Sequence, residues 1–160
     1  AALLASAAQA HLMPAGRGTL NITSDAVYMV LSLPVSTFSG ADINDDGSVT
    51  MDEFNAATRA SIAAIEGGIW LDDGLQRLAP QDVLLAPEAG HGHDPQALTE
   101  VSILASFRLS KAGQMPVRFG VELPAAVDST IVIAAKNKAE GLAARLELSR
   151  QIPSADLAWH

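Results

Sequence analysis

Residues 42–53 place oxygen-bearing side chains at regular intervals along a short acidic stretch. Positions 1, 3, 5, 7, 9 and 12 of this stretch are Asp42, Asn44, Asp46, Ser48, Thr50 and Glu53. A hard divalent cation takes about six to eight oxygen ligands at ~2.4 Å, and a loop of this kind supplies them. Gly47 stands at position 6, where the chain must turn sharply and a Cβ would be a steric cost. The spacing therefore predicts a cation-binding loop.

The stretch resembles the calcium loop of the EF-hand family, whose pattern D-x-[DN]-x-[DN]-G-x5-E it matches throughout. The resemblance covers residues 42–66, which are the loop and the helix after it. It implies that Asp42, Asp46 and Glu53 bring charge, that Ser48 gives its carbonyl oxygen and that Thr50 acts directly or through water. Val49 at position 8 points into the core. The alternative is an acidic surface turn, because Asp, Asn and Gly are also ordinary turn residues.

This loop departs from the family in two ways. Pro34 and Gly40 leave room for about one turn of helix before the loop, so we expect the entering helix to be short or missing. No second loop pairs with the first, since residues 70–74 have an acidic turn but neither the required spacing nor a Glu at position 12. A solitary loop predicts modest affinity, roughly 10⁻⁴–10⁻³ M, which suits a structural ion where calcium is abundant.

The first ten residues resemble the end of a secretory signal peptide. Small apolar residues run into the A-x-A cleavage pattern of residues 8–10, which predicts a mature chain that begins at His11. An Ala-rich helix is the alternative, because Ala is the best helix former. We therefore expect a periplasmic or extracellular protein.

Composition narrows the classes of partner. A net charge of −8 argues against nucleic acid and anionic lipid, and no apolar run reaches the ~18–20 residues of a membrane span. The chain has no cysteine, so it has no disulfide framework. A protein partner is compatible with the sequence, but no feature identifies one.

Most of the remaining chain predicts short strands. Residues 18–22 and 26–33 form an expected hairpin, and further strands are expected at 69–71, 75–78, 83–85, 101–109, 117–123, 130–134 and 142–148. Residues 86–95 are expected to be a loop. A helix is predicted over 51–66, ended by Gly67 and Gly68. The fold class that follows is mainly β: an antiparallel β-sandwich, one domain over residues 11–160, with the EF-hand unit 42–66 inserted.

An EF-hand loop between strands of an exported β domain resembles the extracytoplasmic segment of HupE/UreJ-type bacterial membrane proteins. The resemblance covers the early hairpin and the loop. It implies a link to transport of nickel or other metals.

The histidines suggest a second metal site. His91 and His93 share a Gly-rich loop, and the amine and imidazole of a mature N-terminal His11 form a natural chelate for copper(II). This start resembles that of periplasmic copper-carrier sandwiches. The alternative is an exposed loop and chain end without metal, because one H-x-H is a weak motif. A periplasmic copper or nickel accessory domain is therefore the second hypothesis.

No motif of a catalytic site is present. The sequence has no cysteine nucleophile, G-x-S-x-G, P-loop or H-E-x-x-H. We expect a binding protein rather than an enzyme, and calcium as its cofactor.

Overall fold

The computed structural model describes residues 13–38, 40–90, 96–123 and 130–160. Over these residues the fold is mainly β, with two sheets and one α-helix, and the predicted mainly-β fold class is confirmed. The strands, in chain order, are β1 (Arg17–Ile22), β2 (Ala26–Pro34), β3 (Ile69–Asp72), β4 (Arg77–Leu78), β5 (Gln81–Ala89), β6 (Leu98–Arg108), β7 (Arg118–Val121), β8 (Ile131–Asn137), β9 (Leu142–Leu148) and β10 (Ser154–Asp156). The helices are the 3₁₀ turn η1 (Val35–Thr37) and α1 (Met51–Gly68).

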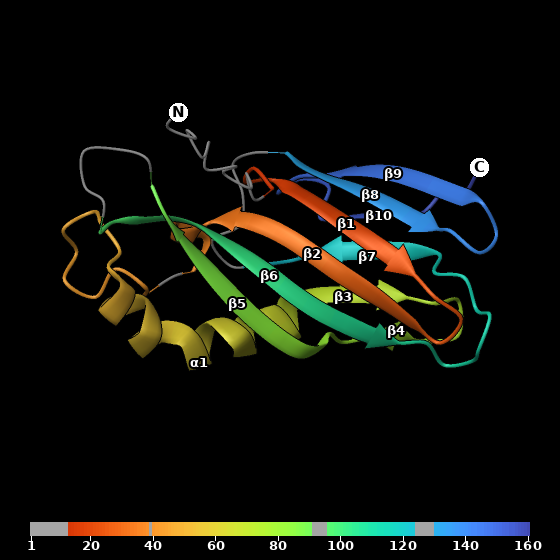
Figure 1. Cartoon of the computed structure of the whole chain (residues 1–160), viewed down its shortest axis with the longest axis horizontal. Coiled ribbons are helices and arrows are strands. Elements are labelled where there is room, and N and C mark those ends of the chain that lie inside the picture. The colour runs from red at the N-terminus through yellow and green to blue at the C-terminus, as the bar shows by residue number, and fades with distance from the viewer. Residues whose placement is uncertain (1–12, 39, 91–95, 124–129) are drawn as a thin grey trace, which may run out of the picture.

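The strands form two layers. One is a six-stranded sheet in the order β5-β6-β2-β1-β8-β9, and the other is a four-stranded sheet in the order β10-β7-β3-β4. In Figure 1 the six-stranded sheet lies in front of the four-stranded sheet and α1. One pair departs from the antiparallel expectation: β1 and β8 are parallel, because β8 enters beside β1 after a long connection instead of a hairpin.

Alternating apolar residues of the long strands fill the core between the layers. Alternate residues of β2 from Val27 to Leu33 are buried, and so are those of β6 from Val101 to Phe107. The rings of Phe107 and Phe119, from β6 and β7, meet edge to face with centroids 6.4 Å apart and join the two sheets. Period-2 alternation therefore identifies the core faces correctly.

Helix α1 begins as predicted but ends later. Thr50 is its N-cap, and Phe54, Ser61 and Ile65 are buried on one face. Gly67 and Gly68 do not stop the helix: both belong to its last turn, and Ile69 is the residue that turns to extended backbone. The sequence-based boundary was wrong because neither glycine adopts the left-handed conformation that ends many helices.

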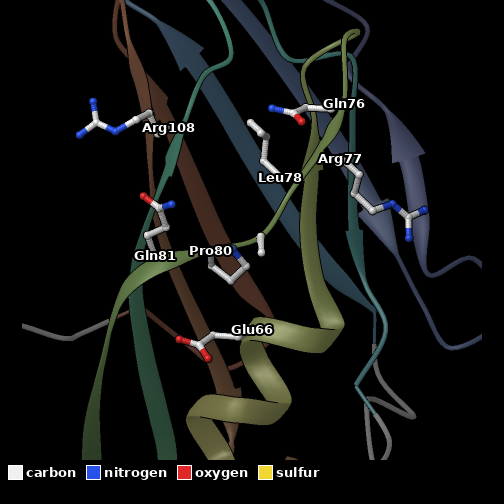
Figure 2. A pocket seen from close by; sticks show the side chains of 8 residues that line it. Glu66, Gln76, Arg77, Leu78, Pro80, Gln81 and Arg108 are labelled. Atoms are coloured by element: carbon white, nitrogen blue, oxygen red, sulfur yellow. The ribbon is translucent and has the colours of Figure 1, made fainter.

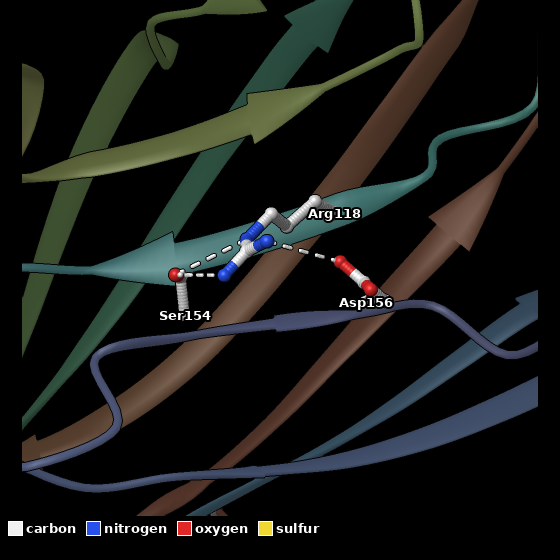
Figure 3. Close-up of polar contacts among 3 residues, drawn as sticks. All are labelled: Arg118, Ser154 and Asp156. Carbon is white, nitrogen blue, oxygen red and sulfur yellow. Dashed lines mark hydrogen bonds and ion pairs between the residues drawn. The ribbon is translucent and has the colours of Figure 1, made fainter.

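Strands β5 and β10 also differ from the sequence analysis. β5 continues to Ala89, so the first part of the expected 86–95 loop is a strand, with Pro87 tolerated because β5 is at the edge of its sheet. β10 was not predicted. It pairs with β7, where Arg118 donates hydrogen bonds to Ser154 Oγ and pairs with Asp156 at 3.3 Å (Figure 3). These side chains are exposed, so the ion pair contributes little stability.

Candidate metal site

The predicted cation loop connects η1 to α1. The approach is one 3₁₀ turn at Val35–Thr37, which confirms the expectation of at most one turn of entering helix. The loop lies at the end of the molecule where β6 begins (Figure 1). The loop therefore has a short 3₁₀ turn on its entry side and the long helix α1 on its exit side.

The first half of the loop folds around its own side-chain oxygens. Asp42 accepts hydrogen bonds from the backbone N–H groups of Asp46 (3.2 Å) and Gly47 (2.9 Å). Asn44 Oδ1 accepts from Asp46 N–H at 2.9 Å, and Asp46 Oδ1 accepts from Ser48 N–H at 2.8 Å. Gly47 has a φ of 83°, the left-handed conformation for which the sequence places a glycine there. Carboxylate oxygens have several lone pairs, so these bonds leave acceptor capacity on the same side chains.

Glu53 links the two ends of the loop. Its Oε2 accepts from the backbone N–H of Thr50 (2.9 Å) and from the Thr50 hydroxyl (2.8 Å), while its Oε1 accepts from Ile43 N–H (3.3 Å). Thr50 in turn accepts from Glu53 N–H, which completes a capping box at the start of α1. Hydrogen bonds from the backbone and side chain of Thr50, and further ones from Ile43 and Asn44, lower the pKa of Glu53 against the opposing effect of burial. The carboxylate therefore stays ionised, as a cation ligand must be.

The loop has a partner that the sequence did not identify. Val49, at position 8, is buried, and its carbonyl accepts a hydrogen bond of 2.8 Å from Leu98 N–H, the first residue of β6. In a paired EF-hand this residue would join the neighbouring loop. Here the six-stranded sheet takes that place. No local signal could have shown this, because any residue other than proline can donate a backbone N–H.

The fit of this loop to an ion rests on its donor chemistry. All of its candidate ligands carry oxygen, which calcium prefers, but no group of three or more His, Cys, Asp or Glu side chains in the described residues lies close enough to hold a metal ion. Ser48 Oγ is a buried polar atom without a hydrogen-bond partner, and no other described side chain has such an atom. An ion would therefore have to draw the carboxylates of Asp42, Asp46 and Glu53 together from the positions recorded here, and their role as ligands stays a prediction.

A hollow lies beside the loop. It has a volume of about 490 Å³, and its lining includes Phe38, Asp42, Ser48, Val49 and Leu98. The buried Phe38, Val49 and Leu98 supply its apolar part, and the loop supplies its acidic rim. Val35 and Ser36 of η1 also line the hollow.

A second hollow, of about 400 Å³, lies where the end of α1 meets β4 and β5 (Figure 2). Its charged side chains do not converge: Arg77 and Arg108 point to opposite sides in Figure 2. The guanidinium of Arg77 instead lies 3.7 Å from the centre of the Trp70 ring. This hollow has no arrangement of acid, base or nucleophile that would do chemistry.

The second metal hypothesis concerns residues outside the described part of the chain. His11, His91 and His93 lie there, as do the ten residues of the expected signal peptide. The copper or nickel site, the cleavage after residue 10 and the exported location therefore stay predictions. Among the described helices, none has the length and hydropathy that a bilayer span requires.

Comparison with known proteins adds no family assignment. No protein-family model matches the chain, and a search of the curated proteins found no match. The EF-hand resemblance therefore rests on the loop residues themselves.

Proposed function

We propose that this protein is an exported calcium-binding domain with a single EF-hand loop, and that its ion is mainly structural. The observation that carries the proposal is the position of Glu53, whose carboxylate connects the start of the loop at Ile43 with the start of α1 at Thr50. In an EF-hand loop the position-12 glutamate gives both of its oxygens to one ion, and Glu53 already lies between the two ends of the loop that such an ion would join.

Charge supports the same function. The loop contains five acidic residues and no basic residue: Asp42, Asp45, Asp46, Asp52 and Glu53. Carboxylates within one short loop repel one another, and a divalent cation would relieve that repulsion. The ion would then stabilise the folded chain by mass action, because the unfolded chain has no assembled loop.

A structural ion fits the surroundings of the loop better than a sensor. In sensor EF-hands, calcium opens a pair of helices. Here the described residues before the loop form only the 3₁₀ turn η1, so α1 has no entering α-helix to open against, and the Val49 carbonyl accepts a hydrogen bond from Leu98 at the start of β6. Binding would therefore fix the loop on the sheet, and catalysis has no part in the proposal.

Thermal unfolding with and without calcium tests the proposal. If the dissociation constant is about 1 mM, calcium at about 10 mM adds roughly 1.4 kcal/mol of stability. For a chain of this size, this raises the Tm by about 3–6 °C relative to chelator. Magnesium at the same concentration is the control, and it should give a much smaller shift because it demands octahedral geometry at shorter distances. An unchanged Tm at every calcium concentration would mean that the loop is only a turn.

Variants of the loop test the individual roles by calorimetric titration. Glu53→Gln should abolish measurable binding, because it removes a charge and one ligand oxygen. Asn44→Ala should weaken binding less, because it removes one neutral ligand. Asp45→Asn is the matched control: it removes the same charge within the loop at a position that is not a ligand, and Asn tolerates the φ of 57° found there. Binding by Glu53→Gln as tight as that of the parent would show that the assigned roles are wrong.

A further inference from the structure

The outer face of the six-stranded sheet carries an exposed apolar row. The strand register places Val30 of β2, Leu104 of β6 and Leu84 of β5 side by side on this face. The side chain of Leu84 is 66% exposed and that of Leu104 is 39% exposed, and the nearby Tyr28 is also exposed. Helix α1 and the four-stranded sheet lie behind the sheet in Figure 1, so the described residues place no element over the row.

Charges flank this row symmetrically on β6. Glu100 and Arg108 each lie four residues from Leu104, on opposite sides and on the same face of the strand. At ~3.4 Å per residue, each lies about 14 Å from Leu104 along the strand. On β6 itself, an acidic residue therefore lies at one side of the row and a basic residue at the other, at equal distances from the centre. The carboxylate of Asp82 on β5 lies between Leu104 and Arg108, where it accepts a hydrogen bond from the Ser106 hydroxyl.

The acidic end has no basic partner within the described residues. The register pairs Glu100 directly with Glu88 of β5, and like charges opposite each other destabilise a sheet. Among the described residues, the Glu100 carboxylate accepts a hydrogen bond from the Ser32 hydroxyl, and the Glu88 carboxylate accepts one from the Ser102 hydroxyl. The ion pairs among the described residues, Arg118–Asp156 and Arg145–Glu147, include neither glutamate and not Arg108.

We propose that the outer face of this sheet binds a second copy of the chain. In this dimer the six-stranded sheets of the two copies face each other. A two-fold axis that lies between these facing sheets, passes over Leu104 and runs at right angles to the strands brings the apolar row of one copy onto the same row of the other. Leu104 then meets Leu104 of the second copy, and Glu100 meets Arg108 in two equivalent pairs. Such an interface is isologous, the commonest form among homodimers.

The apolar row would supply the contact, and the charges would set its register. Opposed ion pairs fix orientation and exclude shifted arrangements more than they add affinity. The row is short, so the interface should bury an area at the low end of the range for specific interfaces. We therefore expect a weak dimer with a dissociation constant on the order of 10–100 μM.

Sedimentation equilibrium of the whole chain, over about 1–300 μM, tests this proposal. The parent should show a reversible monomer–dimer equilibrium. Leu104→Asp should weaken dimerisation by at least tenfold, because two carboxylates would meet at the axis. Leu75→Asp is the control: Leu75 is also an exposed leucine, at 65%, but lies in the β3–β4 turn, away from this face.

Charge exchange tests the symmetry of the interface. Glu100→Arg and Arg108→Glu should each weaken self-association, since like charges then face one another. A mixture of the two single variants should dimerise as the parent does, because both pairs are again opposite in sign. Circular dichroism of each variant checks that the fold is kept.

Three results would overturn the proposal. The first is a parent that stays monomeric over the whole range. The second is a dimer that Leu104→Asp leaves unchanged, which would place the interface elsewhere. The third is a loss of thermal stability in Leu104→Asp at a concentration where the parent is monomeric, which would mean that the face is covered within one chain.

Discussion

Asp73 has a carboxylate that could be taken for a cation ligand, but its hydrogen bonds show that it stabilises the fold. It lies in the acidic turn of residues 70–74, yet it is fully buried. Its carboxylate accepts backbone N–H groups from Leu75, Gln76 and Ser110 at 2.8–3.0 Å, so it ties the β3–β4 turn to the segment after β6. Burial alone would raise the pKa of Asp73, but the hydrogen bonds from Ser110, Gln76 and Leu75 prevail and lower it to about 2.

Replacing Asp73 by Asn should destabilise the protein by about 2 kcal/mol at neutral pH, because an amide accepts these N–H groups with one neutral oxygen. The folded pKa of about 2 is below the ordinary 3.8, so the ionised group contributes full stability above pH ~3.8. That contribution is lost as the pH falls toward 2. The free energies of unfolding of the parent and Asp73→Asn, measured in urea, should therefore differ most near pH 7 and least near pH 2.

Asp156→Asn is the control for this comparison, because Asp156 is 80% exposed and makes only the surface pair with Arg118. It should change the free energy of unfolding by less than ~0.5 kcal/mol at either pH. If the free energies of unfolding of the parent and Asp73→Asn differ as much near pH 2 as near pH 7, the charge of Asp73 is not what stabilises the turn.

At the scale of elements, the last turn of α1 contains two adjacent glycines that differ in how much space surrounds them. A Cβ at Gly67 would meet nothing within 4 Å, whereas a Cβ at Gly68 would lie 2.7 Å from the backbone oxygen of Glu122. Gly68 is also held there by a 2.6 Å hydrogen bond from Glu122 N–H to its carbonyl. The close approach of α1 to the segment after β7 therefore depends on Gly68 alone.

Gly67→Ala should stabilise the protein by about 0.5–1 kcal/mol, because Ala restricts the unfolded chain and favours helix. Gly68→Ala should destabilise it by about 1–3 kcal/mol, because the backbone of residue 122 would have to move. Urea unfolding midpoints of the two variants check this. A Gly68→Ala protein as stable as Gly67→Ala would contradict the close contact.

At the scale of the whole molecule, the loop is joined directly to the six-stranded sheet by a backbone hydrogen bond. The bond from Leu98 N–H to the Val49 carbonyl joins the proposed ion site to β6, and β6 pairs along its length with both β2 and β5. An ion in the loop would therefore stabilise the start of the central strands rather than a separate module.

Calcium should slow hydrogen exchange at the Leu98 amide. Exchange there requires the loop to leave the strand, and an ion that binds only the closed loop reduces that opening by the factor 1 + [Ca²⁺]/Kd, about tenfold at ten times the dissociation constant. The Ala143 amide is the control, because it donates to the His160 carbonyl at the other end of the fold and exchanges by local fraying. Equal slowing at both amides, or none at Leu98, would contradict a local coupling.

The sequence by itself determined the features that depend on neighbours in the chain. The positions of Asp42, Gly47 and Glu53 fix the turn and the helix cap, because each acts on backbone groups within about ten residues. Alternation in β2 and β6 identified the buried faces for the same reason: one side chain in two must face the core.

Only the tertiary structure decided the features that depend on distant segments. It set Leu98 as the partner of Val49, β1 beside β8 in parallel, and Asp73 as a buried acceptor for Ser110. Each depends on backbone hydrogen bonds, which almost any residue can donate or accept. Residue type carries little information about such partners, so packing of the whole chain selects them.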